Sequence, residues 1–504
     1  MTKWTSWGLG VWLLALSHSS FAQNETDVLR YGWIDPLASA RVTAMGGAFG
    51  ALGADLSCMG INPAGIGMYR RGDLSMTAGV HTASTNSLWS TRQVDAAGAD
   101  FVASNYGVAL TYPSVDADWP FFTVAVGHQN RTPFTQKIQI DGVNSSSSVS
   151  DLFVSQALED ALNAGNIFGY ASTDDALSAG DIFGFGASLA WRTGLLLPDN
   201  DALYATAVEG NVTVDRTIER RGRLAETQIA FGTMFQDRIS IGATLGLPRV
   251  SFEESSTHRE SVNDADVELR DWAFQETLSI TGKGILFRFG VLARVSDVLR
   301  VGLAHQTRGR LTLTDTYATS VSTTWIDQSA SNASSPTSNS EYVVMTPDRT
   351  TVSASVLMGK FAVINADYVR SDMRRGELRD SDGWLSTGYD FDAENDAVNA
   401  GYRTIHQARV GLEFRLGDDK QFRIRSGGGM STTPFAEGAV VSNANRTHVS
   451  LGGGYRIGNV HFSAAWRTAW HSEDYYFMGA FSDEPPGQLE RRASSLLLSA
   501  GLRM

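Results

Sequence analysis

Apolar and polar residues alternate along most of the chain after residue 73. Between Ile285 and Val295 every second residue is apolar, whereas Arg288, Gly290 and Arg294 stand on the other face. Because successive side chains of a β-strand point to opposite faces, each such stretch predicts a strand with one apolar and one polar face. Arginine, glutamate and glycine on the polar face suit a wet lumen better than the outside of a soluble sandwich. The pattern therefore predicts a barrel with an apolar outer surface.

The number and spacing of the strands point to a membrane barrel. We count three strands before residue 132 and about eleven after it, about fourteen in all. Short polar turns are expected on one side and long linkers on the other, the asymmetry of outer-membrane barrels. We predict an all-β membrane protein, an antiparallel transmembrane β-barrel of about fourteen strands in the outer membrane of a Gram-negative bacterium. The turns are expected at Gln236–Arg238, Ser296–Asp297, Gly359–Lys360, Gly417–Lys420 and Gly458–Asn459, and the linkers at Ser329–Ser340, Glu377–Tyr402 and Ser472–Gln488.

The N-terminal part of the chain does not follow this alternation. Residues 1–22 resemble an export signal, with a short apolar core and a small-residue cleavage site. The stretch from Ser39 to Tyr69 is rich in glycine and alanine and has neither the helical nor the strand period. We predict a hatch domain, residues 23–73, inside a barrel formed by residues 74–504. The polar stretch from Gln23 to Asp35 is expected along the periplasmic side.

A long insertion interrupts the strands at about residues 132–222. An insertion of this length belongs on the extracellular side of a barrel, where loops are long. Val149–Ala164 has helix-like spacing, and Phe183–Leu197 is expected to extend the strands above the membrane. The apolar residues expected to capture a ligand in this loop are Leu152, Phe153, Leu158 and Leu162.

Charge and chemistry narrow the classes of function. The net charge of −13 disfavours nucleic acid as a partner, because phosphate binding needs clustered lysine and arginine. Cys58 is the one cysteine of the chain, so no internal disulfide is expected, and we interpret it as a packing residue of the hatch. The histidines show no metal-ligand spacing and the acidic clusters are tied to no base. We therefore expect no metal, no cofactor and no enzyme activity.

The N-terminal motifs resemble those of a known family. Ser39–Tyr69, with its SAR, MGGAF and NPAG elements, resembles the hatch of the FadL/TodX outer-membrane transporters of hydrophobic compounds. Ile241–Pro248 and Gly290–His305 are further similar stretches, and the chain looks like the branch found in Bacteroidetes. The resemblance covers most of the chain, although the specific motifs lie in the hatch. It implies a fourteen-stranded barrel plugged by the hatch.

The resemblance also implies passive uptake of hydrophobic small molecules of the long-chain fatty acid or aromatic type. The ligand would be captured at the extracellular loops, enter the barrel and leave past the hatch through a lateral opening in the wall. The family's Asn-Pro-Ala element carries over to this chain as gating residues, and nearby glycines permit the tight turns of a plug. The hatch and gating candidates are Asn62, Pro63, Ala64, Gly65, Gly46 and Gly47.

Partners and alternative functions follow from the same resemblance. Besides the ligand, we expect outer-membrane lipid and lipopolysaccharide as partners, and a monomeric barrel. A related branch includes PorV, a barrel that helps to deliver secreted proteins to the cell surface, and other relatives are labelled haemin receptors. A general porin is a further alternative, against which a plug in the lumen argues.

Overall fold

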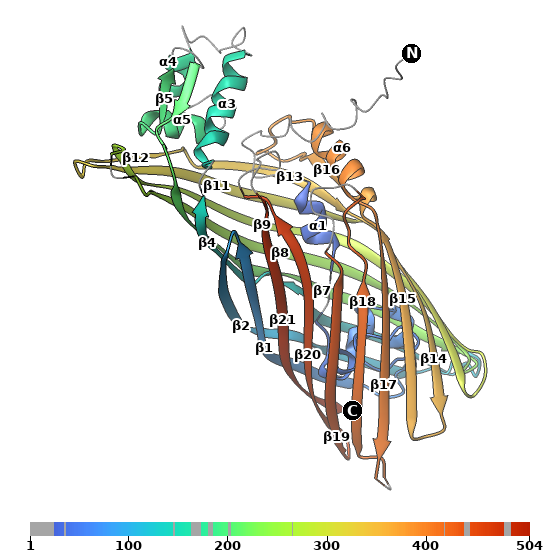
Figure 1. The fold of residues 1–504 in the computed structure, drawn as a ribbon. Coiled ribbons are helices and arrows are strands. Elements are labelled where there is room, and N and C mark those ends of the chain that lie inside the picture. Colours follow the sequence, from blue (N-terminus) through green and yellow to red (C-terminus); the bar gives the residue numbers. More distant parts are fainter. Residues whose placement is uncertain are drawn as a thin grey trace, which may run out of the picture.

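The chain forms a long barrel with helices at its upper end and inside it (Figure 1). The computed structural model describes residues 25–34, 37–144, 147–162, 173–179, 185–199, 203–264, 266–417, 419–437, 444–477 and 485–504. The expected export signal, residues 1–22, lies outside the described residues. None of the described helices is long and apolar enough to cross a membrane.

Antiparallel strands of one sheet make the barrel wall. The first strands are β1 (Asp73–Trp89), β2 (Arg92–Pro113), β3 (Phe121–Pro133), β4 (Gln136–Asn144), β7 (Val212–Phe235), β8 (Ile239–Val262) and β9 (Leu269–Arg294). They are followed by β10 (Leu299–Gln306), β11 (Gly309–Trp325), β12 (Ala330–Ser334), β13 (Ser338–Thr346), β14 (Arg349–Met358), β15 (Ala362–Asp372) and β16 (Glu377–Asp380). The last are β17 (Thr404–Leu416), β18 (Phe422–Ser431), β19 (Arg446–Ile457), β20 (Val460–Tyr475) and β21 (Gly487–Arg503).

Four wall strands are interrupted, and each consists of two consecutive elements. β3 and β4 both pair with β7, and β10 and β11 both pair with β9. β14 and β13 pair with β10 and β11, and β15 and β16 continue the next strand in the same way. β12 pairs with β11 alone and lies beyond the ring. Counted in this way, the wall has fourteen strands.

Pairing between the last and the first strand closes the ring. β21 runs antiparallel to β1, from Asp73 opposite Arg503 to Leu88 opposite Gln488. Along β9 the outward Phe289 is 52% exposed, whereas the inward Arg288 is 2% exposed. The alternation is thus the one expected from the sequence, and the fourteen-stranded antiparallel barrel is confirmed.

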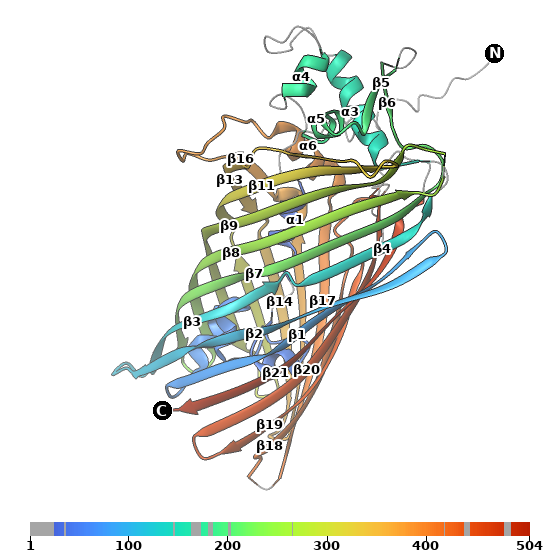
Figure 2. The ribbon, with the colours of Figure 1, turned by 90° about the vertical axis from the view of Figure 1, so that its left-hand side faces the viewer.

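The two ends of the barrel differ. At the lower end in Figures 1 and 2, tight turns join neighbouring strands; Gln236 and Asp237, between β7 and β8, have positive φ. At the upper end stand α3 (Ser150–Leu162), α4 (Thr173–Ala179), α5 (Phe185–Arg192) and the small sheet of β5 (Leu196–Asp199) and β6 (Leu203–Thr206). Because outer-membrane barrels have their long loops outside the cell, we call the upper end extracellular and the lower end periplasmic.

The structure corrects the expected loops in four places, one of which is the expected linker Glu377–Tyr402, because it contains β16 and a helix at residues 392–401. β4 stays paired with β7 until Asn144 meets Val212, so the insertion is shorter than the expected 132–222. The expected strand extension Phe183–Leu197 was wrong over residues 185–192, which form α5. Residues that alternate along a strand also recur every four positions, as residues on one face of a helix do, so the apolar pattern did not distinguish a strand from a helix here. The expected linker Ser329–Ser340 contains β12 and the start of β13, because its polar side chains face water on both sides of an extended hairpin.

The N-terminal helices lie inside the barrel. They are α1 (Thr26–Gly32), α2 (Ala40–Ala44) and the short 3-10 helices η1 (Leu56–Gly60) and η2 (Pro63–Met68); η4 (Met373–Arg375) and α6 (Asp392–Gly401) follow later in the chain. Both views show α1 enclosed by the wall (Figures 1 and 2). The periplasmic position expected for Gln23–Asp35 was therefore wrong for residues 25–34. Val28 and Tyr31 share one helical face and are fully buried, a pattern that the polar composition of this stretch hid.

Candidate functional site

One N-terminal segment crosses the lumen and is tied to the wall by buried hydrogen bonds. We call residues 37–72 the lumenal segment; it contains α2, η1 and η2. The backbone N–H of Ala40 donates to Ser499 Oγ on β21 at 2.8 Å. The hydroxyl of Ser240 on β8 donates to the carbonyl of Ala64 at 2.5 Å. Strands that are far apart around the ring therefore hold the same segment.

The residues expected to gate the channel form one buried turn of this segment. Asn62 caps η2, since its Oδ1 accepts from Ala64 N at 3.1 Å, and its Nδ2 donates to Gly50 O at 2.7 Å. Asn62, Pro63, Ala64 and Gly65 are all buried. The structure thus brings these four expected residues together and fixes the turn by its own hydrogen bonds.

The turn lies directly on the backbone of the wall. A Cβ atom placed on Gly290 of β9 would stand 1.9 Å from Asn62 Oδ1, and one on Gly302 of β10 would stand 3.1 Å from Asn62 Nδ2. Only a residue without a side chain allows such an approach. The glycines of the wall are therefore part of the seat of the lumenal segment.

The two other expected hatch residues pack on a different part of the wall. Gly46 and Gly47 have φ of +66° and +73°, a region that favours glycine. The Gly46 N–H donates to Ser450 Oγ of β19 at 2.9 Å, and a Cβ on Gly46 would lie 2.5 Å from Gly428 N of β18. These glycines form a second seat, separate from the Asn62 turn on β9 and β10.

A buried ionic cluster lies beside the lumenal segment. Arg288 Nη2 donates to Glu226 Oε2 at 2.8 Å, and Arg131 Nε lies 3.6 Å from the same oxygen. Arg131 also donates to the carbonyl of Gly60 at 3.3 Å. The three charged side chains are 1–2% exposed, so Glu226 balances two buried guanidinium groups.

Above this cluster the inner wall becomes apolar. We call this layer the apolar band. Farther up the wall the inner face is charged again, since Arg220 Nε donates to Glu254 Oε2 at 2.5 Å. Helix α1 packs against the band with Val28 and Tyr31. The inward residues of the band are Leu224, Val250, Phe252, Ile280, Leu311, Leu313 and Val344, all buried.

The wall has a break in its backbone pairing between its second and third strands. The ladder between β2 and β3 runs from Pro113 opposite Phe121 to Asn105 opposite Gln129, where it ends. Beyond it, residues 92–104 of β2 pair with β1, and β4 pairs with β7, but no ladder joins β2 to β4. We call this unpaired boundary the seam. The register of β3 also shifts between Asn130 and Thr132, at the start of the seam.

Small residues and one side-chain hydrogen bond occupy the seam. The Thr135 hydroxyl, from the link between β3 and β4, donates to the carboxylate of Asp100 on β2. A Cβ on Gly98 would lie 3.2 Å from Thr135 Cγ2. The two edges are thus in contact through side chains, and their separation would break no backbone ladder.

The insertion caps the extracellular mouth. Glu260 of β8 accepts from the backbone N–H of Val149 at 2.9 Å and from Trp272 Nε1 at 3.0 Å, and thereby fixes the start of α3 to the wall. Of the expected capture residues, Phe153 is 3% exposed and packs against Trp272, and Leu152 is half-buried beside it. Leu158 and Leu162 lie in α3, but their side chains fall outside the described residues. In this closed form Phe153 is a core residue of the cap.

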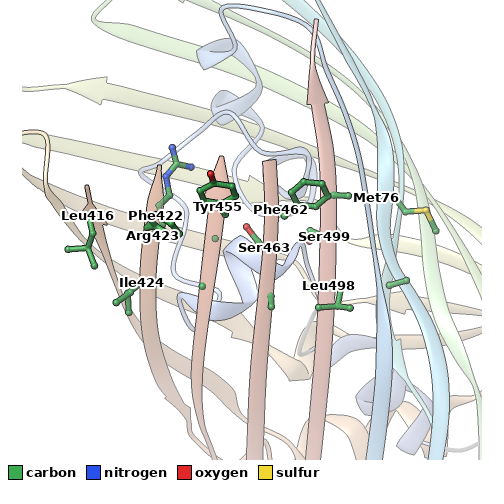
Figure 3. A pocket seen from close by; sticks show the side chains of 15 residues that line it. Met76, Leu416, Phe422, Arg423, Ile424, Tyr455, Phe462, Ser463, Leu498 and Ser499 are labelled. Atoms are coloured by element: carbon green, nitrogen blue, oxygen red, sulfur yellow. The ribbon is translucent and has the colours of Figure 1, made fainter. Parts of the chain in front are cut away.

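A separate groove of about 870 Å³ lies on the outer face of the barrel, over β18–β21 and β1. Figure 3 shows Phe422, Tyr455, Phe462 and Leu498 around it. Its floor is formed by small residues such as Gly453. These four side chains point away from the lumen, whereas Ser499, which also lines the groove, accepts the hydrogen bond of Ala40 inside the barrel.

Some of these features were expected from the sequence and others were not. The residues of the Asn62 turn were expected, and they lie together in the structure. The seam, the Glu226 cluster and the apolar band were not expected. Leu311 and Leu313 alternate with the polar residues Arg310 and Thr312, which was a readable signal of a two-faced strand, although here the apolar face is the inward one. The seam left no such signal, because it depends on which strands fail to pair.

The fold defines the class of protein. A closed barrel of fourteen antiparallel strands with an apolar outer face is an outer-membrane protein of a Gram-negative bacterium. No protein-family model and no curated protein matches the chain.

Several solved structures have a similar fold. A FadL homologue of Pseudomonas aeruginosa has a TM-score of 0.54 at 10% identity, covering 94% of this chain and 99% of that one. The toluene transporter TodX of P. putida gives 0.52 at 13% identity, with 92% and 98% covered. The toluene transporter TbuX of Ralstonia pickettii gives 0.50 at 14% identity, with 92% and 98% covered. The chain therefore has the FadL/TodX fold that its N-terminal motifs suggested.

Proposed function

We propose that this barrel is a channel for passive uptake of hydrophobic small molecules. The ligand is captured at the extracellular cap, passes the apolar band and leaves sideways through the seam. The observation that carries the proposal is the missing ladder between β2 and β4 beyond the end of the β2–β3 ladder. The similar fold of two toluene transporters supports a hydrophobic cargo.

The physical reason for a sideways path is the cost of wetting an apolar molecule. Apolar surface left in water costs roughly 25 cal/mol per Å². The lumenal segment fills the lower lumen with hydrogen-bonded backbone and buried charges, which suit no apolar cargo. An exit through the seam delivers the cargo to the outer face, where β2 carries exposed apolar residues such as Phe101 (72% exposed).

A reversible disulfide across the seam tests this path. In the double variant Gly98→Cys/Thr135→Cys, oxidation should join β2 to the link before β4, because the two positions are in contact. We expect uptake of toluene and of undecanoic acid to fall at least about tenfold on oxidation and to return with reductant. Each single-cysteine variant is the control. Equal uptake by the cross-linked and reduced protein would rule out the seam as the exit.

We propose that the Asn62 turn stabilises the lumenal segment, which closes the lower end of the ligand's path. In Asn62→Ala/Pro63→Ala, η2 loses its cap and the bond to Gly50, a loss of about 0.5–2 kcal/mol for a cap of this kind. We expect slower uptake. Barrel assembly should be normal, and it is measured as the heat-dependent shift of the folded band on a gel. Arg71→Ala, an exposed change just beyond the turn, is the control. Wild-type uptake in the double variant would remove the gating role.

Capture by the loop helix, a monomeric state and association with lipopolysaccharide belong to the same proposal. Native mass spectrometry of the purified barrel measures all three, as bound ligand, stoichiometry and retained lipid. Within the described residues we find no feature that favours secretion support or haemin binding over uptake. A haem group retained by the purified protein would change that preference.

A further inference from the structure

The apolar band is enclosed and already has an occupant. Its inward residues come from β7, β8, β9, β11 and β13, and ionic side chains lie below and above it at Glu226 and Glu254. An enclosed belt of this kind is a place where an apolar body is stabilised. Helix α1 supplies that body: Val28 and Tyr31 are 0% exposed against the band.

The fit of α1 to the band is incomplete. The Tyr31 hydroxyl is buried and makes no hydrogen bond to the wall among the described residues, which costs free energy. Asp27 is also fully buried, and burial raises the pKa of its carboxyl above the usual value although the Arg30 charge opposes this. A helix that served only to fill the band would need neither group.

One hydroxyl of the wall recognises the buried carboxylate. Tyr342 Oη on β13 donates to Asp27 Oδ2 at 2.5 Å. Arg30, which pairs with Asp27, lies over the Phe252 ring at 4.2 Å from its centroid. Asp27 and Arg30 both belong to α1, so the withdrawal of α1 removes both. What then remains around the vacated space is an apolar belt with two hydroxyl donors, that of Tyr342 and that of Tyr402, which here donates to the carbonyl of Glu25 at 3.1 Å. Of the two, Tyr342 is the one that binds a carboxylate in this structure.

We propose that α1 is a displaceable internal occupant of the apolar band, and that the ligand replacing it is an apolar molecule with one hydrogen-bond-accepting end. The acceptor takes the position of the Asp27 carboxylate against Tyr342, and the apolar part takes the positions of Val28 and Tyr31. This inference rests on the proposed uptake of hydrophobic molecules and names the chemistry of the cargo. The apparent affinity of the band is then reduced by the fraction of time that α1 fills it.

A second reversible disulfide tests the displacement. A Cβ on Gly376, beside η4, would lie 3.1 Å from Val28 Cβ, so Val28→Cys/Gly376→Cys should cross-link after a small shift. We expect oxidation to abolish binding of dansyl-labelled undecanoic acid to the purified full-length barrel and reductant to restore it. The single-cysteine variants are the controls. Undiminished binding by the cross-linked protein would overturn the displacement.

The role of Tyr342 is tested by a ratio of affinities. Undecanoate and undecane compete for the labelled probe, and both must displace α1, so the cost of displacement cancels in their ratio. In Tyr342→Phe we expect the preference for undecanoate over undecane to fall about tenfold, the value of one hydrogen bond to a charged acceptor. Asp27→Asn weakens the docking of α1 but keeps Tyr342, and should leave the ratio unchanged. An unchanged ratio in Tyr342→Phe would overturn the assignment of the acceptor site.

The two cross-links separate this inference from the proposed function. If the seam disulfide blocks uptake and the α1 disulfide does not affect binding or uptake, the channel stands and the displacement of α1 is wrong. If the α1 disulfide blocks binding and the seam disulfide does not affect uptake, the ligand site stands and the lateral exit is wrong.

Discussion

Replacing Glu226 with alanine is expected to destabilise the folded barrel by about 3–5 kcal/mol, the largest loss that we expect from a single change in the lumen. The carboxylate balances Arg131 and Arg288, both nearly inaccessible to water. Without it, two buried positive charges would face each other, with no water to solvate them. The effect is measured as the unfolding temperature, which is the temperature at which the band of the compact, folded barrel disappears from a gel.

A matched change on the neighbouring strand controls this experiment. Glu253 lies on β8, points outward and is exposed, so Glu253→Ala removes the same side chain without stranding a buried partner. We expect its unfolding temperature to stay close to that of the wild type. Equal stability of the two variants would show that water or rearranged side chains compensate Arg131 and Arg288.

Replacing Gly290 with valine is expected to open the barrel to ions. The new Cβ would collide with Asn62 Oδ1 at 1.9 Å and approach Ala64 N at 3.2 Å, so the turn must leave its seat on β9. Overpacking of this kind typically costs about 1–3 kcal/mol, and the lumenal segment can relieve it by moving. The strand itself should tolerate valine, which favours β-structure. Single-channel conductance in planar bilayers should rise severalfold over the wild type.

Gly453→Val is the matched control for that result. Gly453 lies on the outer face, and the nearest atom to a Cβ there is the carbonyl oxygen of Arg423 at 3.7 Å, an ordinary contact. The conductance of this variant should equal that of the wild type. If Gly290→Val and Gly453→Val conduct alike, the Asn62 turn does not seal the lumen.

Period-two alternation was sufficient to predict the barrel, and the reason is physical. A strand between lipid and lumen must place unlike residues on its two faces, so Phe289 and Arg288 report their environments directly. The same logic fails inside the barrel. Val28 and Tyr31 belong to a helix of seven residues, too short for its period to stand out in a polar stretch. Its burial follows from the apolar band, which distant strands create together.

The candidate site divides in the same way. The Asn62 turn could be named because the resemblance rests on a short Asn-Pro-Ala element of the sequence, and the structure shows that Asn62 caps η2 locally. The seam was not, because Asn105 and Gln129 look like ordinary strand residues in the sequence. Only the absence of a ladder beyond them distinguishes this boundary, and pairing between strands is a property of the folded ring.

The anchoring of the lumenal segment sets an order for biogenesis. Ala40, near the beginning of the chain, donates to Ser499, which lies on the last strand, and the side chains that hydrogen-bond to Gly46 lie on β19. These bonds cannot form until the C-terminal strands have been synthesised and added to the sheet. Contacts between such distant parts of a chain are slow to form. The nascent barrel must therefore pass through a stage in which its strands are placed while its interior is still unsealed, and closure of the ring and sealing of the lumen become one late event.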